Sequence, residues 1–327
     1  MRRTMKILQT LALSLLLLGT AAAQERLARV GYLSWQDSGA HHEATLKGFV
    51  DGLREQGYVE GKNLELLRRS ASNDPERFKP LARELAAAKV DVFFAPATPM
   101  ATAAWYAAKN TPIVIATIFD PVELKFVNSL ARPGTRVTGV TMMSDELTAK
   151  RLQLLTEAVP GLQRVGLVVH EALRMACSQD IDHTATAAKK LGLTLVMVNV
   201  DRAEALDAAF RKLTDAKVQA VATTLVSTHN GLEKEFAEAA LKYRLPSMLS
   251  NEINVELSGL MSYGPDTTDV YRRAGIYVGR ILKGARPAEM AMEQPREFRL
   301  VVNLKTARAL GVTIPQSVLL RADEVIQ

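Results

Sequence analysis

The fold is decided by residues 29–67, which read RVGYLSWQDSGAHHEATLKGFVDGLREQGYVEGKNLELL. Short apolar runs at Val30–Leu33 and Asn63–Leu67 predict two strands. Between them, four apolar residues recur at the spacing of one helix face: Leu46, Phe49, Val50 and Leu53. Gly57 ends that helix. A strand, an amphipathic helix and a second strand in this order are typical of a parallel α/β unit.

The same alternation continues to residue 141. Asp74 and Pro75 mark the start of another helix, as its cap and its first-turn proline. A further helix is predicted around Met100–Lys109. Three apolar runs predict the remaining strands: Val90–Ala95, Ile113–Thr117 and Val137–Thr141.

A second series of the same kind begins near Ser144, with a helix that reaches Ala158 and ends before Pro160-Gly161. Helical patterns separate its four predicted strands: Val165–Val169, Thr194–Val200, Ala220–Thr224 and Ser247–Leu249. Because a domain takes about 150 residues on average, a chain of 327 residues has room for two. The repeated layout predicts a pair of α/β lobes.

The last part of the chain adds elements that we expect to cross back and forth between the lobes. They are a strand at Leu260–Tyr263, a helix at Thr267–Leu282, a strand at Phe298–Val302 and a helix near Lys305–Leu310. We therefore predict that residues 27–141 and 260–290 form lobe I. Residues 142–259 and 291–327 then form lobe II.

The N-terminus has the pattern of a secretory signal at residues 1–23. Arg2, Arg3 and Lys6 precede the apolar run Ile7–Leu18, and Ala21-Ala22-Ala23 supplies small residues for a signal peptidase. The run is too short for a spanning helix, which needs about 20 residues. We expect cleavage before Gln24 and a mature protein in the periplasm.

Charge and cysteine content narrow the function further. The net charge of +6 includes the three cations of the signal, so the mature chain carries about +3. Its Lys and Arg are spread among Asp and Glu rather than gathered in a basic stripe, which argues against a nucleic-acid partner. Cys177 is the only cysteine, so stability has to come from packing and not from an intramolecular disulfide.

Six motifs stand in the order they have in one known family: Gly57–Asn63 (GYVEGKN), Asp120–Val122 (DPV), Ser129–Gly134 (SLARPG), Leu260–Gly264 (LMSYG), Glu293–Pro295 (EQP) and Val302–Ala307 (VNLKTA). The chain resembles the ABC-transporter substrate-binding proteins of the tryptophan/tyrosine-type uptake family. The resemblance covers nearly all of the mature chain. It implies the type 1 periplasmic binding fold, in which two Rossmann-like lobes with parallel sheets are joined by three crossover strands.

The resemblance also implies a small-molecule solute between the lobes, partners in a membrane permease and its ATPase, and no catalysis. One departure concerns the second lobe, because family members often carry an Asn-Pro-type loop where this chain has Val169-His170-Glu171. His170 is then a candidate for a hydrogen bond to the ligand that titrates near neutral pH. A histidine on a surface loop is the alternative.

Position alone nominates the ligand-binding residues, because open parallel sheets bind ligands beyond the carboxyl ends of their strands. In lobe I the candidates are Ser34, Trp35, Thr98, Phe119 and Asp120. In lobe II they are His170, Ser227, Asn251 and Glu252, and at a crossover they are Tyr263 and Asp266.

Each lobe I candidate has a structural alternative. Thr98 precedes a predicted helix whose free N–H groups favour a ligand carboxylate, and its alternative role is a helix N-cap. Asp120 could pair with a ligand ammonium or form a turn with Pro121. Trp35 offers a flat apolar face to the ligand or is partly buried on the hinge side.

The other candidates are open in the same way. Glu252 could supply a second carboxylate to the ligand, or it is a solvated loop acid. Tyr263 could be a packed crossover residue. Asp266 could simply cap the helix that follows it.

Other site classes find little support in the sequence. His41 and His42 are adjacent, and adjacent residues do not share a helix face, so we expect no metal site there. No P-loop, Gly-x-Ser-x-Gly elbow or dinucleotide fingerprint is present in the sequence, so we expect neither a cofactor nor an enzyme.

We therefore expect a monomeric periplasmic protein that binds a small amino-acid-like or related carboxylate solute by closure of its lobes and delivers it to an ABC importer. The alternative is a periplasmic sensing subunit that presents the same lobes to a receptor kinase or chemoreceptor.

Overall fold

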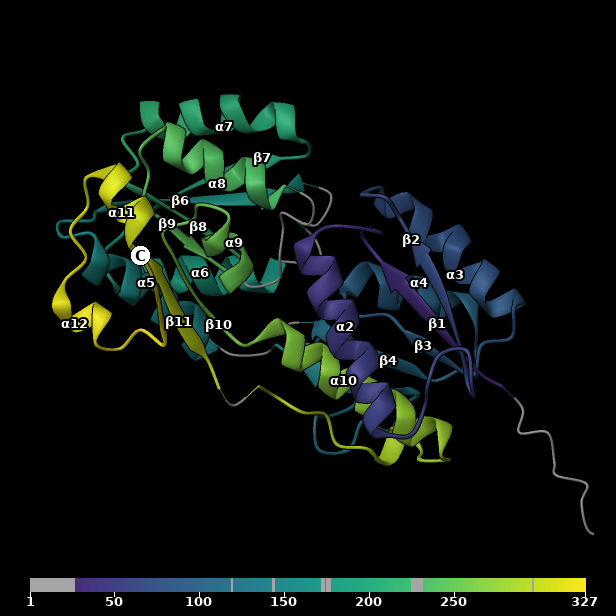
Figure 1. The fold of residues 1–327 in the computed structure, drawn as a ribbon. Helices are drawn as coiled ribbons and strands as arrows, with labels where there is room; N and C mark the ends of the chain where they lie inside the picture. The colour runs from purple at the N-terminus through teal and green to yellow at the C-terminus, as the bar shows by residue number, and fades with distance from the viewer. Residues whose placement is uncertain are drawn as a thin grey trace, which may run out of the picture.

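The computed structural model describes residues 27–118, 120–142, 145–171, 174, 178–224, 232–295 and 297–327. The predicted signal at residues 1–23 therefore lies outside the described residues. The described chain forms two α/β bodies side by side, which we call lobe I and lobe II (Figure 1). None of the described helices combines the length and the apolar character that crossing a membrane requires.

Lobe I is built on a five-stranded parallel sheet with the order β2-β1-β3-β4-β5. Its strands are β1 (Ala28–Ser34), β2 (Leu64–Ser70), β3 (Val92–Phe94), β4 (Ile113–Ile118) and β5 (Val137–Thr141). Its helices are α2 (Ala40–Glu55), the 3₁₀ turn η1 (Pro75–Arg77), α3 (Phe78–Ala87), α4 (Thr98–Ala107) and, from late in the chain, α10 (Thr267–Leu282) and η3 (Pro287–Glu289).

Lobe II is built on a seven-stranded sheet with the order β12-β11-β10-β9-β8-β6-β7. Its strands are β6 (Arg164–His170), β7 (Thr194–Val200), β8 (Ala220–Thr223), β9 (Ser247–Leu249), β10 (Met261–Gly264), β11 (Arg299–Asn303) and β12 (Glu324–Ile326). Its helices are α5 (Asp145–Ala158), α6 (Ser178–Lys190), α7 (Ala203–Asp215), α8 (Glu233–Lys242), α9 (Glu252–Glu256), α11 (Leu304–Leu310) and α12 (Gln316–Leu319). All strand pairs are parallel except β10 with β11.

The two sheets share one winding order. In lobe I the first strand, β1, lies between the second and the third, and in lobe II β6 lies between β7 and β8 in the same way. The arrows of β1 and β6 point toward the space between the lobes (Figure 1). The expected α/β fold with two parallel-sheet lobes is thus confirmed.

The chain passes between the lobes three times. It leaves lobe I after β5, returns between β10 and α10, and leaves again between Glu293 and β11. Glu293 still belongs to the lobe I side, because it forms a parallel bridge with Val140 beside β5. The predicted division placed residues 260–290 in lobe I, whereas β10 pairs in the lobe II sheet through Met261 opposite Met248. The reason is that β9 offers an open parallel edge to β10, and the chain enters lobe I only from α10 onward.

Helix α10 is held on lobe I through a close seam with α2 (Figure 1). A Cβ atom added at Gly52 would lie 1.9 Å from the carbonyl oxygen of Arg272, and one at Gly275 would lie 2.2 Å from that of Phe49. Since both neighbours are backbone atoms, only glycine allows this approach. The seam anchors the returning chain to the first lobe.

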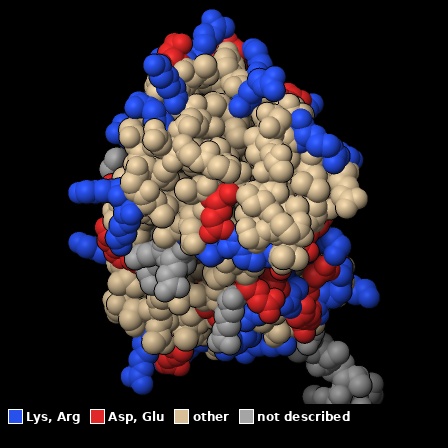
Figure 2. Space-filling model, turned by 90° about the vertical axis from the view of Figure 1, so that its left-hand side faces the viewer, with Lys and Arg blue, Asp and Glu red and all other residues tan. Residues whose placement is uncertain are grey.

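The cores of the two lobes differ in composition. One face of the lobe I sheet packs aromatic rings, with Phe49 stacked on Phe94 at a centroid distance of 4.1 Å and Tyr32 against both. The lobe II core is mainly aliphatic around Phe210 and Phe236. Figure 2, which views the lobe II side, shows a broad uncharged area with Lys, Arg, Asp and Glu mixed around it.

Candidate functional site

The carboxyl end of β1 holds the first two predicted site residues, and both are buried. Ser34 is 7% exposed and Trp35 is 8% exposed. The Trp35 ring packs edge to face on Phe78 at a centroid distance of 5.0 Å, within the lobe I core. Little of the Trp35 face is therefore offered to a ligand, in line with the burial alternative, and its ligand contact stays a prediction.

The helices that follow β1 and β3 begin without a side-chain cap. The N-cap of α2 is Gly39 and that of α4 is Ala97, and neither provides a side-chain hydrogen bond. Thr98 is the half-buried first residue of α4, so the proposed N-cap role for its hydroxyl is not what the structure shows. Both helix starts leave N–H groups and the positive end of the helix dipole available for an anion.

Asp120 follows β4 and is engaged by its own turn. Its Oδ1 accepts hydrogen bonds from the backbone N–H of Val122 at 2.8 Å and of Glu123 at 3.0 Å. The Asx turn weighed as the alternative is therefore present. Phe119, the neighbouring candidate, lies outside the described residues.

In lobe II, His170 ends strand β6, which lies between β7 and β8, and is half-buried. Its Nδ1 atom is buried and has no hydrogen-bond partner among the described residues. Burial lowers the pKa of His170, and the charges of Asp201 and Glu171 oppose that effect. A neutral imidazole with an open nitrogen at a strand end can hydrogen bond to a bound molecule.

Two further lobe II candidates follow β9. Asn251 is buried with 4% exposure. Glu252 forms an ion pair with Arg299 of β11 at 2.7 Å, and Arg299 also contacts Glu324 at 3.1 Å. Burial raises the pKa of Glu252 although Arg299 acts in the opposite direction. Glu252 is thus a partly buried, paired acid and not the solvated loop acid considered from the sequence. Ser227 lies outside the described residues.

The crossover candidates have structural roles. Asp266 is the N-cap of α10, and its Oδ1 accepts from the N–H of Asp269 at 3.0 Å. Tyr263 is half-buried, packs near Phe298 at a ring distance of 6.0 Å and touches the core clusters of both lobes. Burial raises the pKa of Tyr263, so its hydroxyl stays protonated at neutral pH. Whether either residue also touches a ligand stays a prediction.

The sequence-based search missed His41 as a candidate. His41 lies in the first turn of α2, and its buried Nδ1 has no partner among the described residues. Burial, with a smaller contribution from His42, lowers its pKa to about 4. Its position after the carboxyl end of β1 was the available signal, although the histidine pair had been considered only for a metal. The described residues hold no group of three or more metal-ligating side chains.

One contact shows that the carboxyl ends of the two sheets face each other. The Nε2 of Gln179, at the start of α6, donates to Oε2 of Glu123, in the turn that follows β4. The structure thus brings the helix starts of lobe I to the same side as His170 and Asn251 of lobe II. Free N–H groups and neutral polar side chains in such a place suit a small anionic or zwitterionic molecule.

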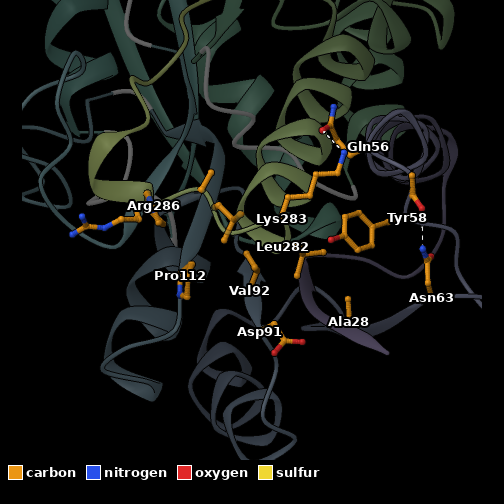
Figure 3. A pocket seen from close by; sticks show the side chains of 14 residues that line it. Ala28, Gln56, Tyr58, Asn63, Asp91, Val92, Pro112, Leu282, Lys283 and Arg286 are labelled. Atoms are coloured by element: carbon orange, nitrogen blue, oxygen red, sulfur yellow. Dashed lines mark hydrogen bonds between the residues drawn. The ribbon is translucent and has the colours of Figure 1, made fainter. Parts of the chain in front are cut away.

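A separate pocket lies at the opposite end of lobe I. It encloses about 690 Å³ and is lined by the turns around Tyr58 and Lys283 and by Asp91, at the amino ends of the strands (Figure 3). None of the predicted site residues lines it. The pocket is therefore distinct from the arrangement at the carboxyl ends.

Comparisons with known proteins bear on this arrangement. The family model described as ABC transporter substrate binding protein matches residues 38–326. A tyrosine-binding protein of Clostridioides difficile is 27% identical over 270 residues, which cover 81% of this chain and 76% of the relative.

Two solved structures are similar over most of the chain. The ABC domain in complex with L-Trp from Streptococcus pneumoniae has a TM-score of 0.84 and 27% identity, and covers 91% of this chain and 99% of its own. A conserved domain protein from Vibrio cholerae has a TM-score of 0.85 and 29% identity, and the match covers 92% of this chain and 100% of the Vibrio chain.

Proposed function

The chain belongs to the family of ABC transporter substrate-binding proteins, and from that premise we propose that it captures a small amino-acid-like carboxylate solute between its lobes by hinge closure and delivers it to a permease and ATPase. The family resemblance given by the sequence motifs is confirmed by these matches. The family consists of solute-binding proteins and is not a class of enzymes.

The observation that carries the proposal is the pair of uncapped helix starts at the carboxyl edge of lobe I. The N-termini of α2 and α4 present backbone N–H groups that no N-cap side chain accepts from. On the side of lobe II that faces them lie two neutral polar side chains, His170 and Asn251. A ligand carboxylate would replace the missing acceptors at these helix starts. Binding of tyrosine and tryptophan by relatives supports an aromatic amino acid as the first candidate.

Closure would follow from differential affinity. A solute that touches both lobes binds the closed state more tightly and shifts the equilibrium toward it. Micromolar binding corresponds to about 8 kcal/mol, which a held carboxylate and a buried apolar body can supply together. We also propose that residues 1–23 are a cleaved export signal, that the mature chain is periplasmic and that it acts as a monomer.

A thermal-shift screen of the purified mature protein tests the solute class. L-tyrosine, L-tryptophan, other amino acids, aromatic acids and sugars are compared at equal concentrations. A solute at 100 times its dissociation constant stabilises the folded state by about 2.7 kcal/mol. We expect amino acids or carboxylates to raise the melting temperature. A response to sugars alone would contradict the proposal.

The carboxylate contact has its own test. L-tyrosine methyl ester, which lacks the negative charge, should bind at least about tenfold more weakly than L-tyrosine, since a charge-assisted hydrogen bond contributes about 1.5–3 kcal/mol. Thr98→Val should weaken L-tyrosine binding, whereas Thr111→Val, at the amino end of β4, should leave it unchanged. Equal affinities for L-tyrosine and its methyl ester would show that the N-termini of α2 and α4 do not hold the ligand carboxylate.

A further inference from the structure

The first turn of α6 is a point where lobe II meets lobe I. Gln179 donates a side-chain hydrogen bond to Glu123 of lobe I. Two residues further on, Ile181 packs against the lobe I core cluster, which also takes in Leu147 from α5. Leu147 is 3% exposed. The first turn of α6 therefore makes a polar contact with lobe I through Gln179 and an apolar one through Ile181. The start of α5 adds a second apolar contact through Leu147.

The residue between these two contacts is a buried acid. Asp180 has no exposed surface. Its Oδ1 accepts from the hydroxyl of Thr148 on α5 at 3.3 Å, and its carbonyl oxygen accepts from the hydroxyl of Thr184 at 2.7 Å. The Thr148 bond ties the first turn of α6 to α5 from inside lobe II, and the Thr184 bond lies within α6 itself.

A buried arginine, one turn beyond Thr148 on α5, connects that helix to the sheet. Arg151 of α5 is 3% exposed, and its Nη2 donates to the Thr223 hydroxyl on β8 and to the Met248 carbonyl on β9, both at 3.3 Å. Its Nε is buried and has no hydrogen-bond partner among the described residues. Burial lowers the pKa of Arg151 to about 10 while Asp180 acts to raise it, so the guanidinium is charged at neutral pH.

This pair is a poor choice for stability alone. The guanidinium makes two long hydrogen bonds and leaves its buried Nε without a partner among the described residues, and burying charges costs free energy that well-packed apolar residues would not cost. Arg151 lies one turn beyond Thr148 on α5, and Thr148 contacts Asp180, so the two opposite buried charges attract each other and favour one placement of α6 on α5. In lobe II that arrangement fixes the first turn of α6 relative to α5, β8 and β9.

We propose that Arg151 and Asp180 are positioning residues that hold the first turn of α6 where Gln179 and Ile181 meet lobe I, and that they thereby set how long the closed lobes retain a solute. Neither residue has to touch the solute for this role. The effect on solute retention rests on the proposed function. The placement of the turn does not.

Cross-linking between the lobes tests the placement without a solute. The parent is the mature chain with Glu123→Cys, Gln179→Cys and Cys177→Ser, treated with a short bismaleimide. We expect rapid cross-linking in the parent and an initial rate lower by at least about fivefold after Asp180→Asn, as an equilibrium shift of about 1 kcal/mol would give. Asp182→Asn, exposed on the same helix, is the matched control and should keep the parent rate.

A charge-neutral variant covers the case in which Asp180→Asn unfolds the protein. Arg151→Gln combined with Asp180→Asn removes both charges and keeps a polar side chain at each position, and circular dichroism shows whether it is folded. We expect the same loss of cross-linking. A parent that fails to cross-link, or a folded variant that cross-links at the parent rate, overturns the placement.

Binding kinetics with L-tyrosine as the probe test the effect on retention. The dissociation rate should rise by at least about fivefold in either variant, while the association rate stays unchanged, because contacts formed on closure act mainly on dissociation. Equal dissociation rates would refute that part. If L-tyrosine binds to no form of the protein, the proposed solute class fails and the cross-linking result still decides the inference.

Discussion

Lobe I and lobe II have the same winding order around β1 and β6 but differ in what fills them. The lobe I core contains stacked aromatic rings, and glycines at the contact between α2 and α10 allow the backbones of these two helices to approach closely. Among the described residues, two charged side chains are buried, Arg151 and Asp180, and both lie in lobe II. Lobe II therefore encloses two opposite charges within a mainly aliphatic core, whereas lobe I relies on tight packing of aromatic rings and helices. The charges favour the one geometry in which they compensate each other.

The largest expected effect comes from breaking the polar pair of lobe II. Asp180→Ala should lower the free energy of unfolding by about 4 kcal/mol, because it leaves Arg151 as an uncompensated buried charge. Urea unfolding followed by circular dichroism measures the change. Asp182→Ala, exposed on the same helix, should cost less than about 0.5 kcal/mol. Similar losses in the two variants would show that Asp180 does not compensate the buried charge of Arg151.

The seam of lobe I should be nearly as sensitive. Gly52→Ala should cost about 3 kcal/mol, since the added methyl group meets the backbone oxygen of Arg272, which cannot move alone. Gly31→Ala on β1 is the comparison, because its nearest neighbours are side-chain atoms of Leu85 and Val90 at 3.2–3.3 Å. It should cost about 1 kcal/mol. If Gly52→Ala were no worse than Gly31→Ala, the helices would not be held by backbone contact.

Acid should act through His41 at the edge of lobe I. Its pKa is about 4 in the folded protein, below the value of about 6.5 expected when unfolded, so protons bind preferentially to the unfolded chain as the pH falls below 6.5. The free energy of unfolding should fall by about 2 kcal/mol between pH 7 and pH 5 on this account. His41→Gln should remove most of that slope in urea titrations at the two pH values. An unchanged slope would refute the assignment.

The smallest effect is expected at exposed ion pairs, whichever lobe carries them. Glu65 pairs with Arg29 between β1 and β2, and Glu324 pairs with Arg299 between β11 and β12, and all four side chains are well exposed. Glu65→Gln and Glu324→Gln should each cost about 0.5 kcal/mol, and the cost should vanish in 1 M salt, where the screening length is about 3 Å. A loss above about 1.5 kcal/mol in either lobe would mean that the pair has a structural role.

Several elements have the limits that the sequence predicted. Val137–Thr141, Thr194–Val200 and Thr267–Leu282 agree residue for residue with β5, β7 and α10. Apolar periodicity sets such limits when an element is long enough to show its period. The short α9, α12 and β12 were not predicted, because each mixes polar and apolar residues over three to five positions with no apolar run or repeat.

The candidate site was only partly predictable. Its location at the strand ends follows from the parallel α/β pattern, so the sequence could nominate Thr98, Asp120 and His170 by position. What each side chain does there depends on its neighbours in space. Asp120 binds two backbone N–H groups of its own turn, a pattern visible locally, whereas Glu252 pairs with Arg299, which is 47 residues away.

The sequence by itself determined the element order, the paired lobes and the family, since these depend on residue periodicity and on motifs along the chain. Only the tertiary structure decided that β10 joins the lobe II sheet, that Glu252 is paired and that Gln179 reaches Glu123 across the lobes. The physical reason is that periodicity is a local property of the chain. Burial, charge compensation and contact between lobes arise between residues that are distant in sequence and are brought together only by folding.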